Sequence, residues 1–148
     1  MCYLFRQMEH YRKLERLYSR APVNQWYAPE LHIDEGSSEL RMDLRPEYHH
    51  SAGAVHGSIY FKALDDATFF AANSLVEGFF VLTAKFEIEF LKPVALGEIR
   101  AMAKVTEQNE RRILAEGELY SFNGDLIGRG KGSFAISKIA LTPDVGYV

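Results

Sequence analysis

The spacing of apolar residues changes along the chain, and each spacing predicts a different element. Over residues 4–18 apolar side chains recur every three or four positions, with basic residues between them, which predicts an amphipathic helix. Pro22 and Pro29 then bracket a non-helical connection. We therefore expect an N-terminal helical extension, residues 1–29, that packs on a main domain, residues 30–148.

Strict alternation of apolar and polar residues predicts strands over much of the main domain. Two runs flank Gly36, over residues 31–33 and 40–44, and form either one bulged strand or a short hairpin. Asn123-Gly124, a preferred pair for tight hairpin turns, separates the last two of the later strands. Because short turns favour antiparallel pairing, we expect an antiparallel sheet. The later alternating segments are residues 86–90, 99–105, 113–122 and 126–136.

A helix with a different pattern lies between these strands, from Ser58 to about Ser74. Its apolar residues occupy nearly the whole circumference, as is typical of a buried helix. We expect Ser58 to cap its N-terminus, because a serine hydroxyl accepts a hydrogen bond from an otherwise unpaired amide. One apolar helix against a curved antiparallel sheet defines an α+β domain. Since one sheet cannot cover so apolar a helix, we also expect a second subunit.

Composition and charge exclude several classes of protein. The chain has 148 residues, 47% of them hydrophobic, which suits one folded domain and excludes a disordered chain. Acidic residues outnumber basic ones, 20 to 17, so we expect no nucleic-acid partner. The single Cys2 excludes an internal disulfide and a cysteine zinc cluster. With no apolar run of about 20 residues and no signal-like N-terminus, we expect a cytoplasmic protein without a membrane span.

The residues best suited to chemistry precede and enter the central helix. Residues 49–58 combine three histidines with small residues and a predicted helix start, and Asp65 and Asp66 follow. Amides at a helix start lack intrahelical partners and attract negative charge. Gly57 has no side chain, so a ligand oxygen can approach its N–H closely, as an oxyanion hole requires. An ordinary loop-to-helix turn fits the same pattern, and the sequence leaves both interpretations open.

Helix geometry separates the two neighbouring aspartates. Phe61, Asp65 and Phe69 lie on one stripe, which places Asp65 between two aromatic rings. If that stripe is buried, the pKa of Asp65 rises, as suits a general base or a nucleophile. The alternative is an interface carboxylate bound to a backbone amide. Asp66 lies four residues after Lys62, and we expect these two side chains to pair as solvated surface charges.

Two further patterns give weaker predictions. The histidines and aspartates of this region have no recognised zinc spacing, so we expect neither a metal nor another cofactor. Residues 128–133 superficially match a phosphate-binding loop, but Gly132 separates Lys131 from Ser133 and no helix is predicted after them. A glycine-rich strand is the simpler interpretation, although Arg129 and Lys131 can still offer phosphate contacts from a sheet edge.

A set of short motifs follows in a characteristic order. His56-Gly57-Ser58 leads to Asp65, nine residues after the histidine. Downstream stand Thr83, Phe90, Pro93, Gly97-Glu98 and Asn123-Gly124. In these residues the sequence resembles the PaaI-like acyl-CoA thioesterases of the hotdog fold, over about residues 30–138. The resemblance implies a long central helix wrapped by a curved antiparallel sheet, with the N-terminal helix as an addition.

The resemblance also implies a mechanism that two subunits share. Gly57 would donate its amide to the thioester carbonyl oxygen, and His56 would help to position the substrate. Asp65 of the neighbouring subunit would act as nucleophile or as general base for water, with Thr83 bonded to the acid or the water. Implied partners are an acyl-CoA substrate and further copies of the chain, in a homodimer or a dimer-of-dimers tetramer. Predicted substrate contacts are His50, Ser58, Phe61, Phe69, Arg129 and Lys131.

Three residues depart from the family pattern. Ser58 replaces a second glycine, His50 replaces an amide side chain, and Asp66 adds a negative charge beside Asp65. A non-catalytic acyl-CoA or lipid-binding hotdog protein is therefore an alternative, favoured by the bulky phenylalanines of the helix. A hydratase or dehydratase is a third hypothesis, although Phe70 stands where the Asp-x-x-x-x-His segment of such enzymes would place the histidine.

Overall fold

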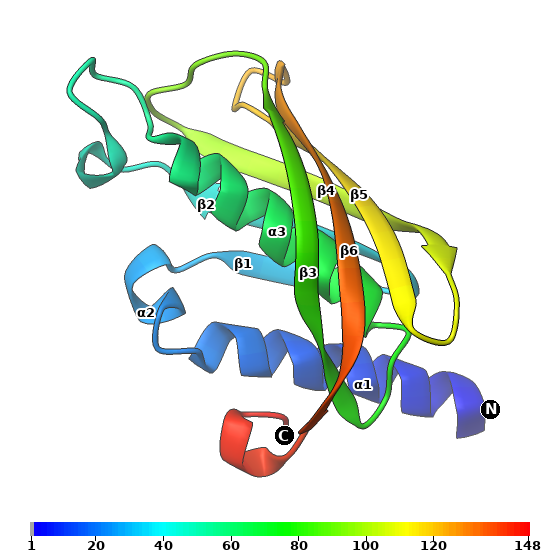
Figure 1. Ribbon diagram of the computed structural model, residues 1–148. Helices are drawn as coiled ribbons and strands as arrows, with labels where there is room; N and C mark the ends of the chain where they lie inside the picture. The colour runs from blue at the N-terminus through cyan, green and yellow to red at the C-terminus, as the bar shows by residue number, and fades with distance from the viewer. Residues whose placement is uncertain (1) are drawn as a thin grey trace.

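A six-stranded antiparallel sheet wraps around one long helix in the computed structural model, which describes residues 2–148 (Figure 1). The strands lie in the order β1-β2-β4-β5-β6-β3, and the central helix is α3, Gly57–Asn73. This arrangement confirms the predicted α+β domain. The other helices are α1, Cys2–Arg20, and α2, Asn24–Tyr27, with short 3-10 turns at Pro46–Tyr48 and Pro143–Val145. The strands are β1 Glu30–Asp34, β2 Ser37–Asp43, β3 Phe79–Phe90, β4 Glu98–Gln108, β5 Arg112–Tyr120 and β6 Leu126–Ala140.

Small residues bring α3 into close contact with the sheet. Ala63, Ala67 and Ala71 of α3 are fully buried. Opposite them the sheet carries glycine, and a Cβ added at Gly117 would lie 3.2 Å from the Leu64 side chain. On β6, a Cβ at Gly130 would collide with the Phe86 ring. The glycines of β6 therefore serve close packing within a strand, and the glycine-rich-strand interpretation of this segment is confirmed.

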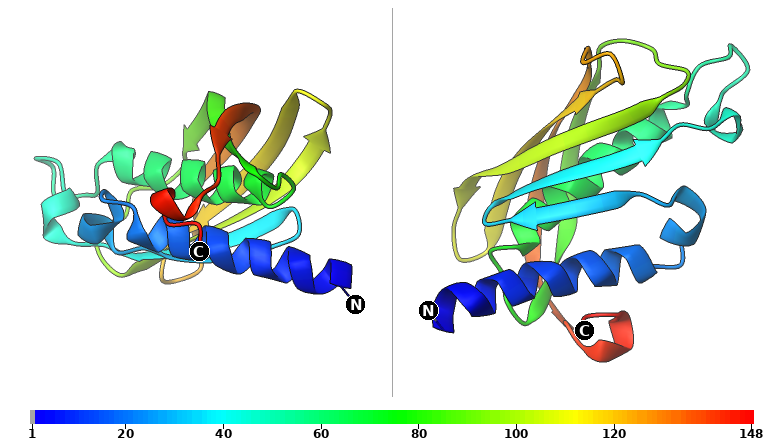
Figure 2. Two further views of the ribbon diagram at one scale, coloured as in Figure 1. Left: turned by 90° about the horizontal axis from the view of Figure 1, so that it is seen from below. Right: turned by 180° about the vertical axis from the view of Figure 1, so that it is seen from behind.

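One edge of the sheet is covered by a helix and the other is open. Helix α1 runs alongside β1 and covers that edge (Figure 2). Its side chains also satisfy the outward-facing backbone, since the Ile33 N–H donates to Glu15 at 2.7 Å and the Ile33 carbonyl accepts from Arg12. At the other edge, no strand among residues 2–148 pairs with the outer side of β3. An open edge of twelve residues is a ready template for pairing with another chain.

The N-terminal helix is anchored to the body by side chains as well as by packing. The His10 ring is buried, with Nδ1 2.7 Å from the Tyr147 hydroxyl and Nε2 3.0 Å from the Asn73 carbonyl oxygen. These contacts tie α1 to the end of α3 and to the C-terminal segment, which lies against α1 in Figure 1. The expected amphipathic helix is confirmed, and its buried apolar residues are Tyr11, Leu14, Leu17 and Tyr18.

Two strand details go beyond the sequence pattern. The segment around Gly36 forms a hairpin between β1 and β2, with Gly36 at φ +65° in the turn, so the bulged-strand alternative is wrong. Strand β3 begins at Phe79, before the alternating residues 86–90. Its pairing with β6 shifts register between Thr83 and Lys85, which interrupts the alternation and hides the first half of the strand from a period-two analysis.

Candidate active site

The central feature of the site is a half-buried carboxylate in the middle of α3. The Oδ1 atom of Asp65 accepts a hydrogen bond of 2.9 Å from the Thr83 hydroxyl, so α3 and β3 together position it. Burial raises the pKa of Asp65 to about 6, and the neighbouring charge of Asp66 adds to the effect. The Thr83 hydrogen bond and the Lys62 ammonium lower the pKa of Asp65 and so offset part of this increase. A carboxylate with this proton affinity can exchange a proton near neutral pH.

Asp66 points toward the N-terminal helix and is not the solvated charge that the sequence predicts. Its Oδ2 atom lies 2.6 Å from the Lys62 ammonium and accepts a 2.6 Å hydrogen bond from the Tyr18 hydroxyl. Lys62 in turn donates to Asn24 at 2.7 Å. The predicted Lys62–Asp66 pair exists, but α1 covers it, and the Asp66 side chain is 17% exposed.

The start of α3 presents an unpaired amide. The His56 side chain is the N-cap, because its Nδ1 atom accepts from the Ser58 N–H at 3.0 Å. Since an amide can only donate, the ring proton of neutral His56 lies on Nε2. Ile59 donates to the His56 carbonyl. Within residues 2–148 the Gly57 N–H has no acceptor, so this helix start can bind a negatively charged oxygen.

This capping arrangement corrects the prediction that Ser58 is the N-cap. The Ser58 hydroxyl lies 2.8 Å from His56 Nδ1 and thus holds the capping ring in place. Position 57 is closely approached by a side chain, because an added Cβ would lie 2.9 Å from the ring of Phe90 on β3, which would have to move aside. Phe90, a residue that is 57% exposed, therefore forms one wall beside the free amide.

A single chain does not bring the amide and the carboxylate together. Gly57 and Asp65 lie on the same helix, eight residues apart, which separates their backbones by about 12 Å along the axis. To act on one carbonyl group, the amide nitrogen must lie about 3 Å from the carbonyl oxygen, and the atom that attacks must lie about 3 Å from the carbonyl carbon. One reaction centre can use both only if they come from two copies of the chain.

The remaining residues of the histidine loop have structural partners. His49 bonds to the Ala95 carbonyl through Nε2 at 2.7 Å. His50 is exposed, and its Nδ1 accepts from the Ala52 amide at 3.1 Å within the turn. No group of three or more histidine, cysteine or acidic side chains among residues 2–148 is placed to hold a metal ion.

The aromatic residues that flank Asp65 on α3 differ in accessibility. Phe61 is 43% exposed and meets Phe86 of β3 edge to face, with ring centroids 5.3 Å apart. Phe69 is half-buried and packs against Phe70 and the core ring of Phe134. Phe61 can therefore contact a ligand beside Asp65, whereas Phe69 mainly supports the core.

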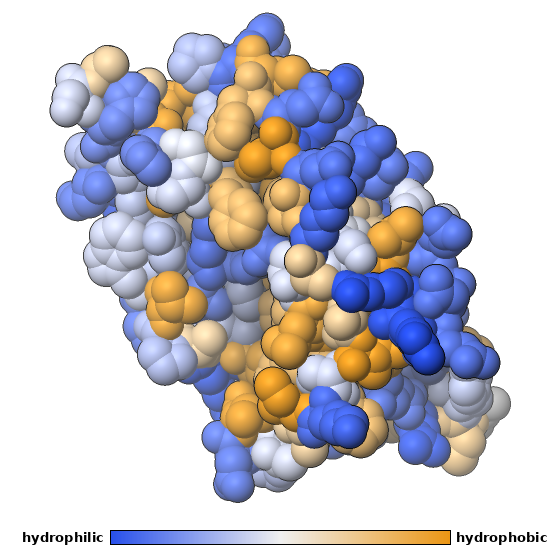
Figure 3. Space-filling view, in the orientation of Figure 1, coloured by the Kyte–Doolittle hydropathy of each residue, from blue (hydrophilic) through white to orange (hydrophobic). Residues whose placement is uncertain are grey.

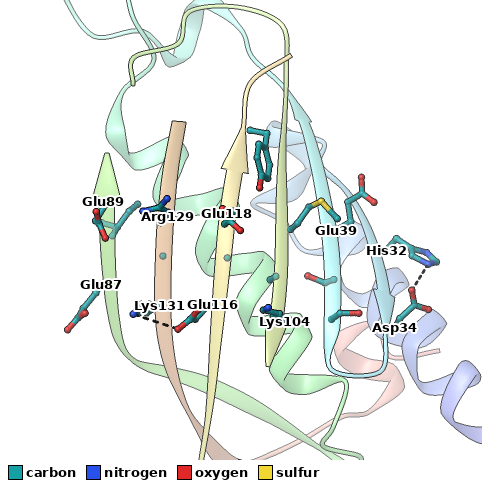
Figure 4. A pocket seen from close by; sticks show the side chains of 18 residues that line it. His32, Asp34, Glu39, Glu87, Glu89, Lys104, Glu116, Glu118, Arg129 and Lys131 are labelled. Carbon is teal, nitrogen blue, oxygen red and sulfur yellow. Dashed lines mark ion pairs between the residues drawn. The ribbon is translucent and has the colours of Figure 1, made fainter. Parts of the chain in front are cut away.

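Arg129 and Lys131 lie on the opposite face of the sheet from Asp65. On β6 the alternating glycines face α3, so these two side chains point outward into a hollow of about 950 Å³ (Figure 4). There Lys131 pairs with Glu116 at 3.7 Å, and Arg129 stands between Glu89 and Glu118 in register. Their neighbours are carboxylates, so the structure does not place them in one site with Asp65.

Sequence reasoning selected Asp65 and Gly57 as candidates but did not identify the residues that hold the neighbouring Lys62 and Asp66. Tyr18 and Asn24, which hold Asp66 and Lys62, belong to the N-terminal extension. The only available signal was that Tyr18 lies on the apolar stripe of α1. Nothing in the spacing indicates that its hydroxyl reaches a residue 48 positions away.

Comparison with known proteins identifies the family to which this chain belongs. The model of the thioesterase superfamily matches residues 52–127, just over half of the chain, including the free Gly57 amide and the Asp65–Thr83 pair. The chain belongs to the thioesterase superfamily. It is similar to "Putative esterase SSO1253" of Saccharolobus solfataricus, 25% identical over 70% of this chain and 69% of that one. A "Putative esterase" of Sulfurisphaera tokodaii is 28% identical over 68% and 74%.

Solved structures share the same architecture. The Escherichia coli PaaI protein from the phenylacetic acid degradation operon superposes with a TM-score of 0.83, at 19% identity, over 92% of this chain and 99% of that one. A thioesterase family protein from Silicibacter pomeroyi gives 0.77 at 24% identity, over 84% and 97%. The fold is therefore the hotdog fold, as expected. Among residues 2–148, none of the helices combines the length and apolar composition that crossing a bilayer requires.

Proposed function

We propose that the protein is an acyl-CoA thioesterase that hydrolyses a thioester to a free acid and the CoA thiol. The observation that carries the proposal is the Asp65 carboxylate, half-buried, bonded to Thr83 and with a raised pKa. Membership of the thioesterase superfamily supports the reaction class. The free Gly57 amide supplies the second requirement, a donor for the oxygen that becomes negatively charged.

The complete site is proposed to form between two copies of the chain. The open edge strand β3 carries exposed apolar side chains toward its two ends, and Figure 3 shows a band of apolar surface in this region of the molecule. Leu82 is 47% and Phe90 is 57% exposed. Burial of such a band against a second β3 edge is favourable, both for its apolar area and for its unpaired backbone groups. It also allows Asp65 of one copy to approach Gly57 of the other.

In this site the Gly57 N–H donates to the thioester carbonyl oxygen and stabilises the negative charge that forms on it. Ionised Asp65 either attacks the carbonyl carbon itself or removes a proton from the attacking water. If Asp65 attacks, the carbon–sulfur bond breaks, the CoA thiolate leaves, and water then hydrolyses the anhydride on Asp65 to the free acid and the carboxylate. If water attacks, its oxygen bonds to the carbonyl carbon, the carbon–sulfur bond breaks, and the thiolate takes up the proton that Asp65 removed. Thr83 keeps the carboxylate oriented, and the Nε2–H of His56 is free to donate to the substrate.

Two pairs of variants test the proposal in a thiol-release assay with a panel of acyl-CoA esters. Gly57→Pro removes the amide hydrogen at the first helical position, where proline is tolerated, and Gly57→Ala adds side-chain bulk but keeps the hydrogen. Loss of the donor should lower kcat by about 10²–10³-fold in Gly57→Pro relative to Gly57→Ala. Asp65→Asn should abolish most activity, whereas Asp125→Asn in the exposed β5–β6 turn should not change it.

The results separate the alternatives. Equal activity in Gly57→Pro and Gly57→Ala, with Gly57→Ala still active, would remove the amide from the mechanism, and full activity in Asp65→Asn would remove the carboxylate. Stoichiometric binding of acyl-CoA without thiol release would instead support the non-catalytic binder, for which the exposed Phe61 and Phe90 rings offer apolar contacts. A monomeric mass at micromolar concentration would contradict the shared site.

A further inference from the structure

Asp65 lies next to a charged network that the N-terminal extension holds in place. Asp66 and Lys62 form an ion pair of 2.6 Å in which both side chains are mostly buried, 17% and 15% exposed. Tyr18 donates to Asp66, and Asn24 accepts from Lys62. The Lys62 ammonium also lies 5.3 Å from the Tyr18 ring centroid and 5.1 Å from that of Tyr27.

The two residues of the extension that hold this network, Tyr18 and Asn24, are also bonded to each other. The Asn24 amide nitrogen donates to the Tyr18 carbonyl at 2.8 Å, so the end of α1 and the start of α2 are fixed relative to each other. The Tyr18 ring is also held by an edge contact with Phe70 of α3, at 5.0 Å between centroids. Lys62 and Asp66 are thus fixed by partners on each side, unlike an exposed ion pair, whose side chains move freely in water.

We propose that Lys62 and Asp66, held by Tyr18 and Asn24, are positioning residues that adjust the proton affinity of the half-buried Asp65 and thereby the pH range of its reaction. The N-terminal extension then has a role in the chemistry without touching the substrate. The inference rests on the proposed function for its link to catalysis. Its electrostatic part rests on the placement of Lys62 and Asp66 three residues before and one residue after Asp65 on α3, and it can be measured on a protein that has no detectable activity.

The charged and titratable groups that face Asp65 are few. On α3 these are Asp66, a like charge that favours the protonated acid, and Lys62, an opposite charge that favours the ionised form. Strand β3 contributes the neutral Thr83 hydroxyl. Helix α1 contributes Tyr18, whose pKa is raised by burial and by Asp66, so that it remains a neutral donor. Because Lys62 and Asp66 are mostly buried, salt screens their charges little.

The experiment compares Lys62→Gln and Asp66→Asn, because a positioning role predicts opposite shifts while simple loosening of the structure does not. Removal of the ammonium should raise the midpoint of Asp65 titration, and removal of the carboxylate should lower it, each by about 0.5–1 pH unit. Tyr18→Phe removes the proton that partly neutralises Asp66, so the midpoint should rise by less than in Lys62→Gln. Lys62→Arg, which keeps the charge, should restore the wild-type midpoint.

Two readouts follow the same carboxylate. The first is the 13C signal of the Asp65 carboxyl, assigned by its absence in Asp65→Asn and titrated from pH 4 to 8. The second is the acid limb of kcat/KM for thioester hydrolysis. Matched controls are Lys13→Gln and Glu9→Gln, which break an ion pair of the same spacing, 3.4 Å long, on the exposed side of α1. Neither should move either midpoint.

Shifts in opposite directions in the 13C titration support the inference, and parallel shifts of kcat/KM extend it to catalysis. Shifts of both variants in one direction, no shift, or equal shifts in the controls would overturn it. An unchanged midpoint in Tyr18→Phe would overturn the part played by the extension. If no variant or wild-type protein releases thiol while the 13C midpoints still diverge, the thioesterase function fails and the electrostatic coupling stands. Should Lys62→Gln not fold, Lys62→Met retains the apolar stem and replaces it.

Discussion

Asp65→Asn should stabilise the folded protein at neutral pH, although it is expected to remove activity. The wild-type carboxylate is ionised at pH 8 in an environment that disfavours its charge. Asparagine is neutral at every pH, has nearly the same shape, and retains an oxygen that can accept from Thr83. The variant therefore removes the charge and leaves most of the packing unchanged.

The magnitude follows from the difference in proton affinity between the folded and unfolded chain. The pKa of Asp65 is about 6 in the folded protein, and in the unfolded chain it takes the ordinary aspartate value of 3.8. Each pH unit between the two corresponds to about 1.4 kcal/mol, so ionised Asp65 lowers the free energy of unfolding by about 3 kcal/mol. Below pH 3.8 both states are protonated and the penalty vanishes. It grows between pH 3.8 and 6, where only the unfolded state has lost the proton, and is constant above pH 6.

Urea denaturation of wild type and Asp65→Asn, at one protein concentration and several pH values, measures this difference. The variant should exceed the wild type by about 3 kcal/mol at pH 8 and by much less at pH 4.5. Asp125→Asn, in an exposed turn, should show no such trend. An advantage of Asp65→Asn that is the same at both pH values would refute the reasoning, because it would not come from ionisation.

Two further predictions concern the Thr83 hydroxyl and the His10 ring. Thr83→Val keeps the shape of the side chain but loses the hydrogen bond that lowers the pKa of Asp65, so the acid limb of kcat/KM should move to higher pH; a limb that stays in place would contradict this role of the hydroxyl. Burial lowers the pKa of His10 below 6.5, so the free energy of unfolding should fall as the pH drops below that value, because the unfolded chain takes up a proton first. His10→Gln should remove this part of the pH dependence in denaturation measured from pH 5 to 7.5, and an unchanged slope would show that another group is responsible.

The fold was accessible from the sequence where one local pattern determines one element. Alternation in β4, β5 and β6 and the Asn123-Gly124 turn predict the antiparallel meander correctly. The first half of β3 was not predictable by the same rule, since its register shift near Thr83 breaks the two-residue period. A bulge is determined by pairing with β6, which a local window does not contain.

The site shows the same limit. Asp65 could be distinguished from Asp66 because helix periodicity is local, and the structure gives Asp65 a bond to Thr83 from another element. The environment of Asp66 was predicted wrongly, because α1 covers it from 48 residues away. Likewise His56 caps α3 in place of Ser58, since a histidine ring can accept from the amide two residues on, a geometry that depends on the backbone of the preceding loop.

The contacts of Glu15 and Arg12 with the Ile33 backbone affect how many copies of the chain can assemble by pairing of edge strands. Glu15 and Arg12 occupy the N–H and the carbonyl of Ile33, where an incoming strand would pair with β1, and α1 lies along that edge, whereas the outer edge of β3 is open within residues 2–148. A sheet with one blocked edge and one open edge can pair with only one other copy. The resulting continuous sheet has a blocked edge at each end. If copies join through β3 as proposed, growth by strand addition would therefore end at two chains, and the extension would protect the protein against open-ended fibrous assembly.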